Sequence, residues 1–169
     1  TSSAEKGTVL ISADYAQIEL VVLAHLSGDE VLQKSFRDGT DVHRATAALI
    51  YGTSAENVTS EMRRAAKTIN FGIIYGMSAF RLAKDLGISR TTAKGFIDSY
   101  FAQYPKIREF IAKTVADAEK NGFVETLFHR RRYIQNIKSA NKIEKAAADR
   151  VAVNTPIQGT AADIVKLAM

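Results

Sequence analysis

The chain has 169 residues, of which 46% are hydrophobic and 24% charged, a composition that suits one compact soluble domain. Its net charge of +5 slightly favours polyanionic partners. No apolar run approaches the roughly 18 residues of a membrane helix, so we expect no membrane partner and no signal peptide. Because the chain contains no cysteine, disulfides and thiolate metal sites are excluded.

The expected elements begin with one strand and continue as helices. Residues 8–15 alternate loosely and are rich in β-branched side chains, which predicts a strand that ends beside Asp14. A helix follows at once, and a capping-box pattern at residues 27–30 predicts another that stops near Gly39. Further helices are expected over residues 42–51, 60–75, 79–86, 90–104 and 105–122.

Local sequence patterns predict where these helices begin and end. Asp41 and Ser89 are candidate N-caps, Pro105 suits a first helical turn, and Gly52 and Gly122 suit helix C-termini. Residues 123–134 predict a β-hairpin with a basic tip.

The final part of the chain is expected to contain two helical segments. A helix over residues 143–153 should be interrupted at Pro156 and restart at Gly159. The second segment reaches Met169 without a capping residue, so we expect the chain to be cut within an element.

Residues 61–76 predict a helix. With a rotation of about 100° per residue, their side chains form two different faces. One face is an apolar stripe of Met62, Ala66, Ile69 and Ile73. The opposite side carries Arg63, Lys67, Phe71 and Tyr75 at i+4 steps. Because neither cation has an acid at i+4, this side offers charge for phosphates and rings for stacking.

Several polar residues allow two interpretations from position alone. Asp14 can hold Mg²⁺ at a strand end or cap the next helix, and Glu19 can be functional or simply favoured by the helix dipole. The contiguous Arg130, Arg131 and Arg132 can bind nucleic acid or form a solvated turn. His25, in an apolar run, is expected to be structural.

Four stretches of the chain resemble family A DNA polymerases, in the family's order. Residues 14–20 (DYAQIEL) resemble motif A, and residues 63–76 resemble motif B on the fingers helix. Residues 41–47 lie between them, and residues 154–163 resemble the segment beyond the fingers. The chain is therefore identified as a palm and fingers fragment of the bacterial DNA polymerase I type.

The resemblance implies an α+β fold that is predominantly α-helical. Residues 1–26 would be a palm segment, residues 27–122 the helical fingers, and residues 123–169 a hairpin and return to the palm. The family's second metal-binding Asp, in a later His-Asp-Glu motif C, does not occur here, so the isolated chain is expected to be inactive.

The resemblance also implies a role for each matching residue. Asp14 and the Tyr15 carbonyl would bind Mg²⁺, of which the complete enzyme would hold two ions, and Lys67 would be catalytic as a proton donor. The dNTP would contact Gln17, Glu19, His43, Arg63, Lys67, Phe71 and Tyr75, with Glu19 as the steric gate against ribonucleotides. Primer–template DNA would contact Tyr75, Arg131, Arg132, Arg150, Asn154 and Gln158.

The implied reaction is template-directed addition of a deoxynucleotide to a primer 3′ end, by a monomeric enzyme that is cytoplasmic in a bacterium or phage-encoded. Departures from the family pattern are Ala16 for Ser, Val21 for Arg, His129 for Gly, and residues 134–137 (IQNI) for Leu-Pro-Asp-Ile. Two alternatives are a fragment of a single-subunit RNA polymerase, which Glu19 disfavours, and a DNA-binding helical module without catalysis.

Overall fold

The computed structural model describes residues 15–169, which form a predominantly helical fold with one small hairpin, as expected. In chain order the elements are α1 (Tyr15–Ser27), α2 (Glu30–Arg37), α3 (Val42–Tyr51), η1 (Ala55–Asn57), α4 (Ser60–Ile74), α5 (Ala79–Leu86), α6 (Arg90–Gln103), α7 (Pro105–Asn121), β1 (Phe123–Glu125), β2 (Arg131–Tyr133) and α8 (Lys142–Ala168). None of the described helices is both long and apolar enough to cross a membrane.

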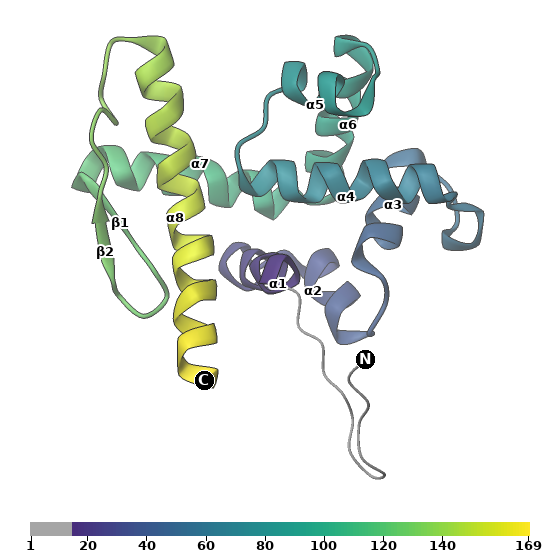
Figure 1. The fold of residues 1–169 in the computed structure, drawn as a ribbon, viewed down its shortest axis with the longest axis horizontal. Coiled ribbons are helices and arrows are strands. Elements are labelled where there is room, and N and C mark those ends of the chain that lie inside the picture. Colours follow the sequence, from purple (N-terminus) through teal and green to yellow (C-terminus); the bar gives the residue numbers. More distant parts are fainter. Residues whose placement is uncertain (1–14) are drawn as a thin grey trace.

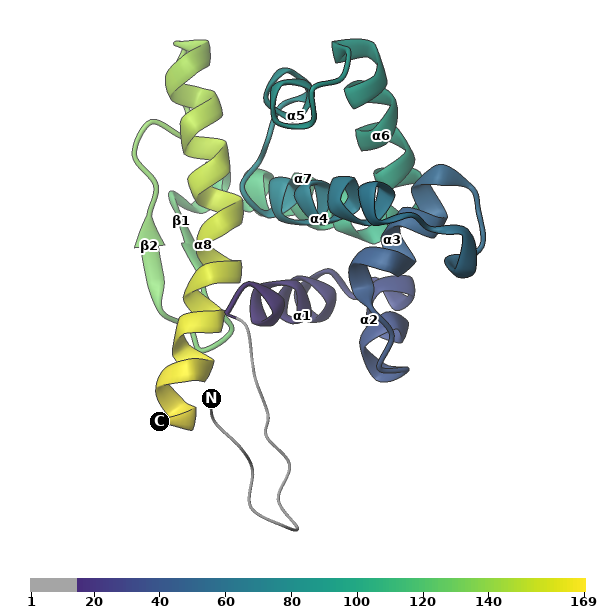
Figure 2. The same cartoon turned by 45° about the vertical axis from the view of Figure 1, so that its right-hand side comes forward.

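Helix α4 crosses the middle of the molecule (Figures 1 and 2). Helix α1 lies on one side of α4, and α5 and α6 lie on the other. Helix α8 passes the ends of α1 and α4, and the β1–β2 hairpin lies along α8. The C-terminal end of α4 is therefore placed where three separate parts of the chain meet.

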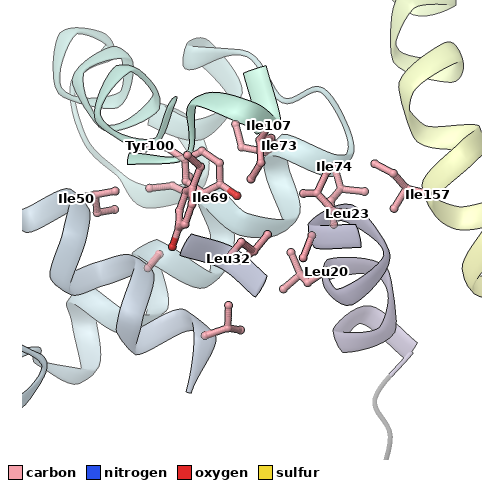
Figure 3. Close-up of a cluster of buried hydrophobic side chains, with 14 of the residues drawn as sticks. Leu20, Leu23, Leu32, Ile50, Ile69, Ile73, Ile74, Tyr100, Ile107 and Ile157 are labelled. Carbon is pink, nitrogen blue, oxygen red and sulfur yellow. The ribbon is translucent and has the colours of Figure 1, made fainter. Parts of the chain in front are cut away.

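The main core forms between α1, α4 and their neighbours (Figure 3). The predicted apolar stripe of α4 is confirmed, because Ala66, Ile69 and Ile73 are buried and Met62 is half-buried against the core. Ile157 of α8 enters the same cluster. Burial of each large aliphatic side chain contributes roughly 1.5–3 kcal/mol, which fixes the orientation of α4 about its axis.

Most predicted helix ends are confirmed by their capping interactions. The Asp41 carboxylate accepts hydrogen bonds at the N-terminus of α3, and Ser89 Oγ accepts one from the Thr92 N–H at 3.1 Å. Pro105 is the first residue of α7, and Gly122 ends α7 with a φ of 80°.

The predicted capping box at residues 27–30 is wrong. Asp29 is the N-cap of α2, accepting from the Leu32 N–H at 3.0 Å.

The predicted interruption at Pro156 is also wrong, because α8 is a single helix of 27 residues. Proline lacks an N–H and costs about 3 kcal/mol within a helix. That cost is opposed by burial of one continuous face of α8, which comprises Ala148, Ala152, Val153, Pro156, Ile157, Thr160 and Ala161. Packing against α1, α7 and β1 therefore keeps the helix intact through the proline.

The hairpin is confirmed, with Phe123 opposite Tyr133 and Glu125 opposite Arg131. His129 at its tip has a φ of 65°, a left-handed conformation that the Gly common in the family would adopt without strain. The hairpin tip therefore places a non-glycine residue in a conformation that favours glycine, at a cost of about 1 kcal/mol.

Two other expectations concern the N-terminal part of the chain. The strand expected over residues 8–15 lies outside the described residues, apart from Tyr15, which begins α1 instead. His25 is exposed in the last turn of α1 and is not the packed residue that its apolar neighbours suggested. The division of the chain into a palm segment, helical fingers and a return to the palm, with boundaries after residues 26 and 122, stays a prediction.

Candidate functional site

Asp41 joins two of the predicted phosphate-binding residues. Its Oδ1 accepts hydrogen bonds from the backbone N–H groups of His43 and Arg44, at 3.0 and 3.2 Å. Its Oδ2 accepts from Arg63 Nε at 2.8 Å. The Asp41 carboxylate therefore fixes the start of α3 relative to the Arg63 guanidinium on α4. Arg63 thus has an acidic partner, which is the N-cap residue of another helix.

The electrostatics of this pair follow from its position at the surface. Burial by itself would raise the pKa of Asp41, but the hydrogen bond and charge of Arg63, with the backbone N–H groups, lower it overall. Both side chains are about 40% exposed, so solvent screens their attraction. Because the pKa of Asp41 is lowered, its ion pair with Arg63 stabilises the fold at pH values above 3.8, the ordinary pKa of this group. That stabilisation is lost as the pH falls through the pKa of Asp41 in the folded state.

We expect Asp41→Ala to lower the free energy of unfolding by about 1–2 kcal/mol at neutral pH, since it removes both the cap and the ion pair. Asp41→Asn keeps the cap and should cost less than about 1 kcal/mol. Urea unfolding at neutral pH and near pH 3 measures both effects, and the difference between wild type and Asn should shrink at the lower pH. A difference that grows on acidification would contradict the assigned ion pair.

His43 and Phe71 form an aromatic pair at the contact of α3 and α4. Their ring centroids lie 5.4 Å apart with an interplanar angle of 65°. His43 is buried, and Phe71 is half-buried against the main core. The expectation that Phe71 stands on the polar face is therefore only partly right, because its side chain is partly buried against the main core.

Lys67 is exposed on α4, one turn beyond Arg63. Within residues 15–169 the ion pairs do not include Lys67. Its ammonium group can therefore bind an anionic ligand without first breaking one of these ion pairs.

Glu19 is the most deeply buried acid of the predicted site, at 2% exposure. Tyr75 Oη donates to Glu19 Oε2 at 3.3 Å, and the Gln158 side chain also hydrogen-bonds this carboxyl group. Burial raises the pKa of Glu19, and the Tyr75 and Gln158 hydrogen bonds partly oppose that rise. Predicted nucleotide-binding residues from α1 and α4 thus meet a predicted DNA-binding residue from α8.

Two further predicted DNA-binding residues of α8 lie against the C-terminal end of α4. Asn154 Nδ2 donates to the Ile74 carbonyl at 3.3 Å. The stem of Arg150 lies so close to Gly76 that a Cβ there would be 2.6 Å from Arg150 Cγ. Gly76 also has a φ of 67°, so both its conformation and its neighbour favour glycine.

The three consecutive arginines near the hairpin tip have intramolecular partners. Arg130 pairs with Asp163 at 3.0 Å, and Arg132 Nη1 donates to Thr155 Oγ1 at 3.4 Å. Arg131 pairs with Glu125 at 2.7 Å and lies over the Phe123 ring at 4.3 Å. The arginines are therefore exposed to solvent and also joined to the hairpin and α8 by intramolecular contacts.

Asn70 was not expected to be functional, yet it is fully buried in α4 and hydrogen-bonds both His43 and Thr46. Its sequence position offered one indication, because Asn70 follows Ala66 by four residues and so adjoins the apolar stripe. A polar residue there must find a buried partner.

Residues 2–169 match the family model described as DNA polymerase family A. This chain belongs to that family. It is 54% identical to DNA polymerase I of Borreliella burgdorferi, over 98% of this chain and 18% of the relative. It is 52% identical to the thermostable DNA polymerase I of Thermus aquaticus, over 98% of this chain and 20% of the relative. The chain spans about a fifth of the length of these relatives.

A solved structure of this family has the same fold. It is described as the POL domain of Pol1 from M. smegmatis in complex with DNA primer-template and dNTP. The TM-score is 0.86 at 41% identity, over 92% of this chain and 27% of the other. The predicted family and the mostly helical fingers and palm fold are thus confirmed, while the roles of individual residues stay predictions.

The metal-binding residues predicted for this family A chain fall at the edge of the described region. Asp14 lies outside it, and Tyr15 begins α1. Within residues 15–169, no group of three or more His, Asp or Glu side chains is placed to hold a metal ion. The described residues by themselves therefore do not make a metal centre.

The departures from the family pattern fall in different environments. Val21 is 44% exposed on α1, so the absence of an arginine there leaves an apolar surface position. Ile134 and Ile137 are buried in the smaller core cluster beside α8. Packing alone therefore explains why the first and last residues of the IQNI segment are apolar.

Proposed function

We propose that this chain is the part of a DNA polymerase that selects the incoming nucleotide and contacts the primer–template. The observation that carries the proposal is the junction of Glu19, Tyr75 and Gln158, where α1, α4 and α8 meet. The larger protein, here called the parent polymerase, would add deoxynucleotides to a primer 3′ end. The complex of the M. smegmatis relative with primer-template and dNTP supports this proposal.

In this proposal α4 binds the triphosphate and the base from one face. Arg63, held by Asp41, and the exposed Lys67 would contact phosphate oxygens as charge-assisted donors. Lys67 would also give a proton to the leaving pyrophosphate. Tyr75, which is 47% exposed at the end of α4, would stack near the template base.

Selection between the two kinds of sugar would come from Glu19. Its carboxyl group is held by Tyr75 and Gln158 and cannot swing away without breaking both hydrogen bonds. A rigid, bulky group beside the sugar would exclude a ribose 2′-hydroxyl. Phe71 would pack beside the same sugar.

The proposal also covers the metal ions and the DNA. Asp14 and the Tyr15 carbonyl would hold Mg²⁺, which when bound neutralises charge on the phosphates. Arg131 and Arg132 on the hairpin, with Arg150, Asn154 and Gln158 on α8, would contact the primer–template. Because motif C is absent from the chain, the isolated chain is expected not to extend a primer.

Primer extension by the parent polymerase tests this function. We expect extension with dNTPs, and little with the matching ribonucleotides, on a DNA primer–template. Equal use of ribonucleotides would favour a single-subunit RNA polymerase. DNA binding that is unaffected by the next complementary dNTP, together with no extension, would favour a DNA-binding module. Extension by the pure 169-residue chain would contradict the division of the site between this chain and the rest of the parent.

A further inference from the structure

The tip of the β1–β2 hairpin is held on one side of α8 by hydrogen bonds around Gly159. The backbone N–H of Leu127 donates to Thr160 Oγ1 at 2.9 Å, and Thr160 is only 1% exposed. Arg130 Nη2 donates to the Gly159 carbonyl at 3.3 Å and to Asp163 Oδ1 at 3.0 Å. The position of the hairpin tip therefore depends on a short stretch of α8.

Gly159 allows the hairpin tip to approach α8 this closely. A Cβ at residue 159 would lie 2.7 Å from Thr126 Cγ2, which is closer than such atoms approach in folded proteins. Thr126 is 5% exposed, so its side chain has little room to move away. Glycine is a poor residue for the interior of a helix, and alanine is the best. Gly159 therefore lowers the stability of α8 at a position where the hairpin leaves no space for a methyl group.

The side of α8 that holds the hairpin adjoins the side predicted to contact DNA. At about 100° per residue, helix positions four apart lie on nearly the same side. Asn154 and Gln158 therefore form one stripe along α8, and Thr155 and Gly159 form the next stripe around the helix. Arg132 Nη1 donates to Thr155 Oγ1 at 3.4 Å. An arginine of the hairpin is thus placed beside the α8 residues predicted to contact DNA.

We propose that Gly159 and Thr160 are positioning residues that hold the hairpin on α8 and so place Arg131 and Arg132 against primer–template phosphates. The inference rests on the proposed function, in which both arginines contact DNA. Both are carried on β2, which pairs with β1, so a displaced hairpin would move them together. Because hydrogen bonds weaken steeply away from their preferred distance and angle, such a displacement would weaken both phosphate contacts.

A merely structural role for Gly159 has different consequences. A contact that only stabilises the hairpin would affect DNA binding to the same extent whether or not the two arginines are present. A positioning role predicts that Gly159→Ala weakens DNA binding only while Arg131 and Arg132 are present. It also predicts that the loss is reversed by Thr126→Ser, which removes the methyl group that a Cβ would meet.

The first test is hydrogen exchange in the parent polymerase without DNA, read by mass spectrometry from a peptide that covers residues 123–131. The Leu127 N–H should exchange slowly in the wild type, because it is bonded to a buried oxygen. Thr160→Val keeps the approximate volume and removes the acceptor, so this amide should exchange about tenfold faster or more. Thr160→Ser keeps the acceptor and should keep the exchange slow.

The same measurement tests the close approach at Gly159. Gly159→Ala should also speed exchange at the tip, and Thr126→Ser should restore it, because serine retains the hydroxyl that accepts from the Arg130 N–H. Gly95→Ala is the matched control, since Gly95 is an exposed glycine of α6 whose Cβ would meet nothing within 4 Å. Unchanged exchange at the tip in Gly159→Ala or in Thr160→Val would overturn the proposal.

The second test is the affinity of the parent polymerase for a labelled primer–template, measured by fluorescence anisotropy over a range of salt concentrations. We expect Gly159→Ala to raise the Kd about five- to twentyfold and to reduce the salt dependence by about one or two phosphate contacts. Adding Thr126→Ser should return the Kd to within about twofold of the wild-type value. In a background of Arg131→Ala and Arg132→Ala, Gly159→Ala should have no further effect.

The outcomes separate this inference from the proposed function. An equal rise in Kd in both backgrounds, or no recovery with Thr126→Ser, would show that Gly159 acts through α8 itself and would overturn the proposal. An unchanged Kd in the variant that lacks both arginines would contradict the proposed DNA contact of the hairpin, and with it the positioning role. The exchange measurements distinguish the two failures, because they require no DNA.

Discussion

Lys67→Ala in the parent polymerase is expected to slow single-turnover dNTP incorporation by about 100- to 1000-fold and to weaken dNTP affinity. Lys67 lies one turn beyond Arg63 on the exposed side of α4 and takes no part in the ion pairs of the described residues. Its removal would eliminate both a cation beside the phosphates and the proposed proton donor, since no other lysine lies on that face of α4.

Rapid-quench measurements over a range of dNTP concentrations separate the two effects of this substitution. Lys67→Arg keeps the positive charge but does not give up a proton, so it should restore affinity more than rate. Lys94→Ala removes an exposed lysine of α6 that pairs with Asp98, and it should leave both quantities unchanged. Wild-type single-turnover kinetics in Lys67→Ala would remove Lys67 from the catalytic role.

Glu19→Ala is expected to raise ribonucleotide incorporation relative to deoxynucleotide incorporation by about 100-fold. The substitution removes the bulk beside the sugar and also releases Tyr75 and Gln158 from their hydrogen bonds. The measured quantity is the ratio of kcat/KM for matched ribo- and deoxynucleotides. Glu19→Gln retains the bulk and should keep most of the discrimination, so it separates size from charge. An unchanged ratio in Glu19→Ala would refute the gate assignment.

Helix ends were predictable because their causes are local. Asp41, Ser89 and Gly122 act on backbone groups within a few residues, so their effects depend little on the rest of the fold. The apolar stripe of α4 was predictable for a similar reason, since helical periodicity alone decides which side chains share a face.

The errors arose where tertiary contacts outweighed local preference. Pro156 should break a helix, but burial of the α8 face on both sides of it keeps the helix continuous. The acidic partner of Arg63 is 22 residues away, so inspection of i+4 positions could not find it. The same holds for the Asn70–His43 bond, which requires α3 and α4 to be packed in register.

The hydrogen bond from Asn154 to the Ile74 carbonyl has a consequence for the order of events during protein synthesis. Asn154 follows Ile74 by 80 residues, so at about 5–20 residues per second it is made about 4–16 s later. Until then the last carbonyl of α4 must be satisfied by water. Gln158 is made later still, so Glu19 completes its buried contacts only when α8 is present. The candidate site therefore assembles only after α8 has been made.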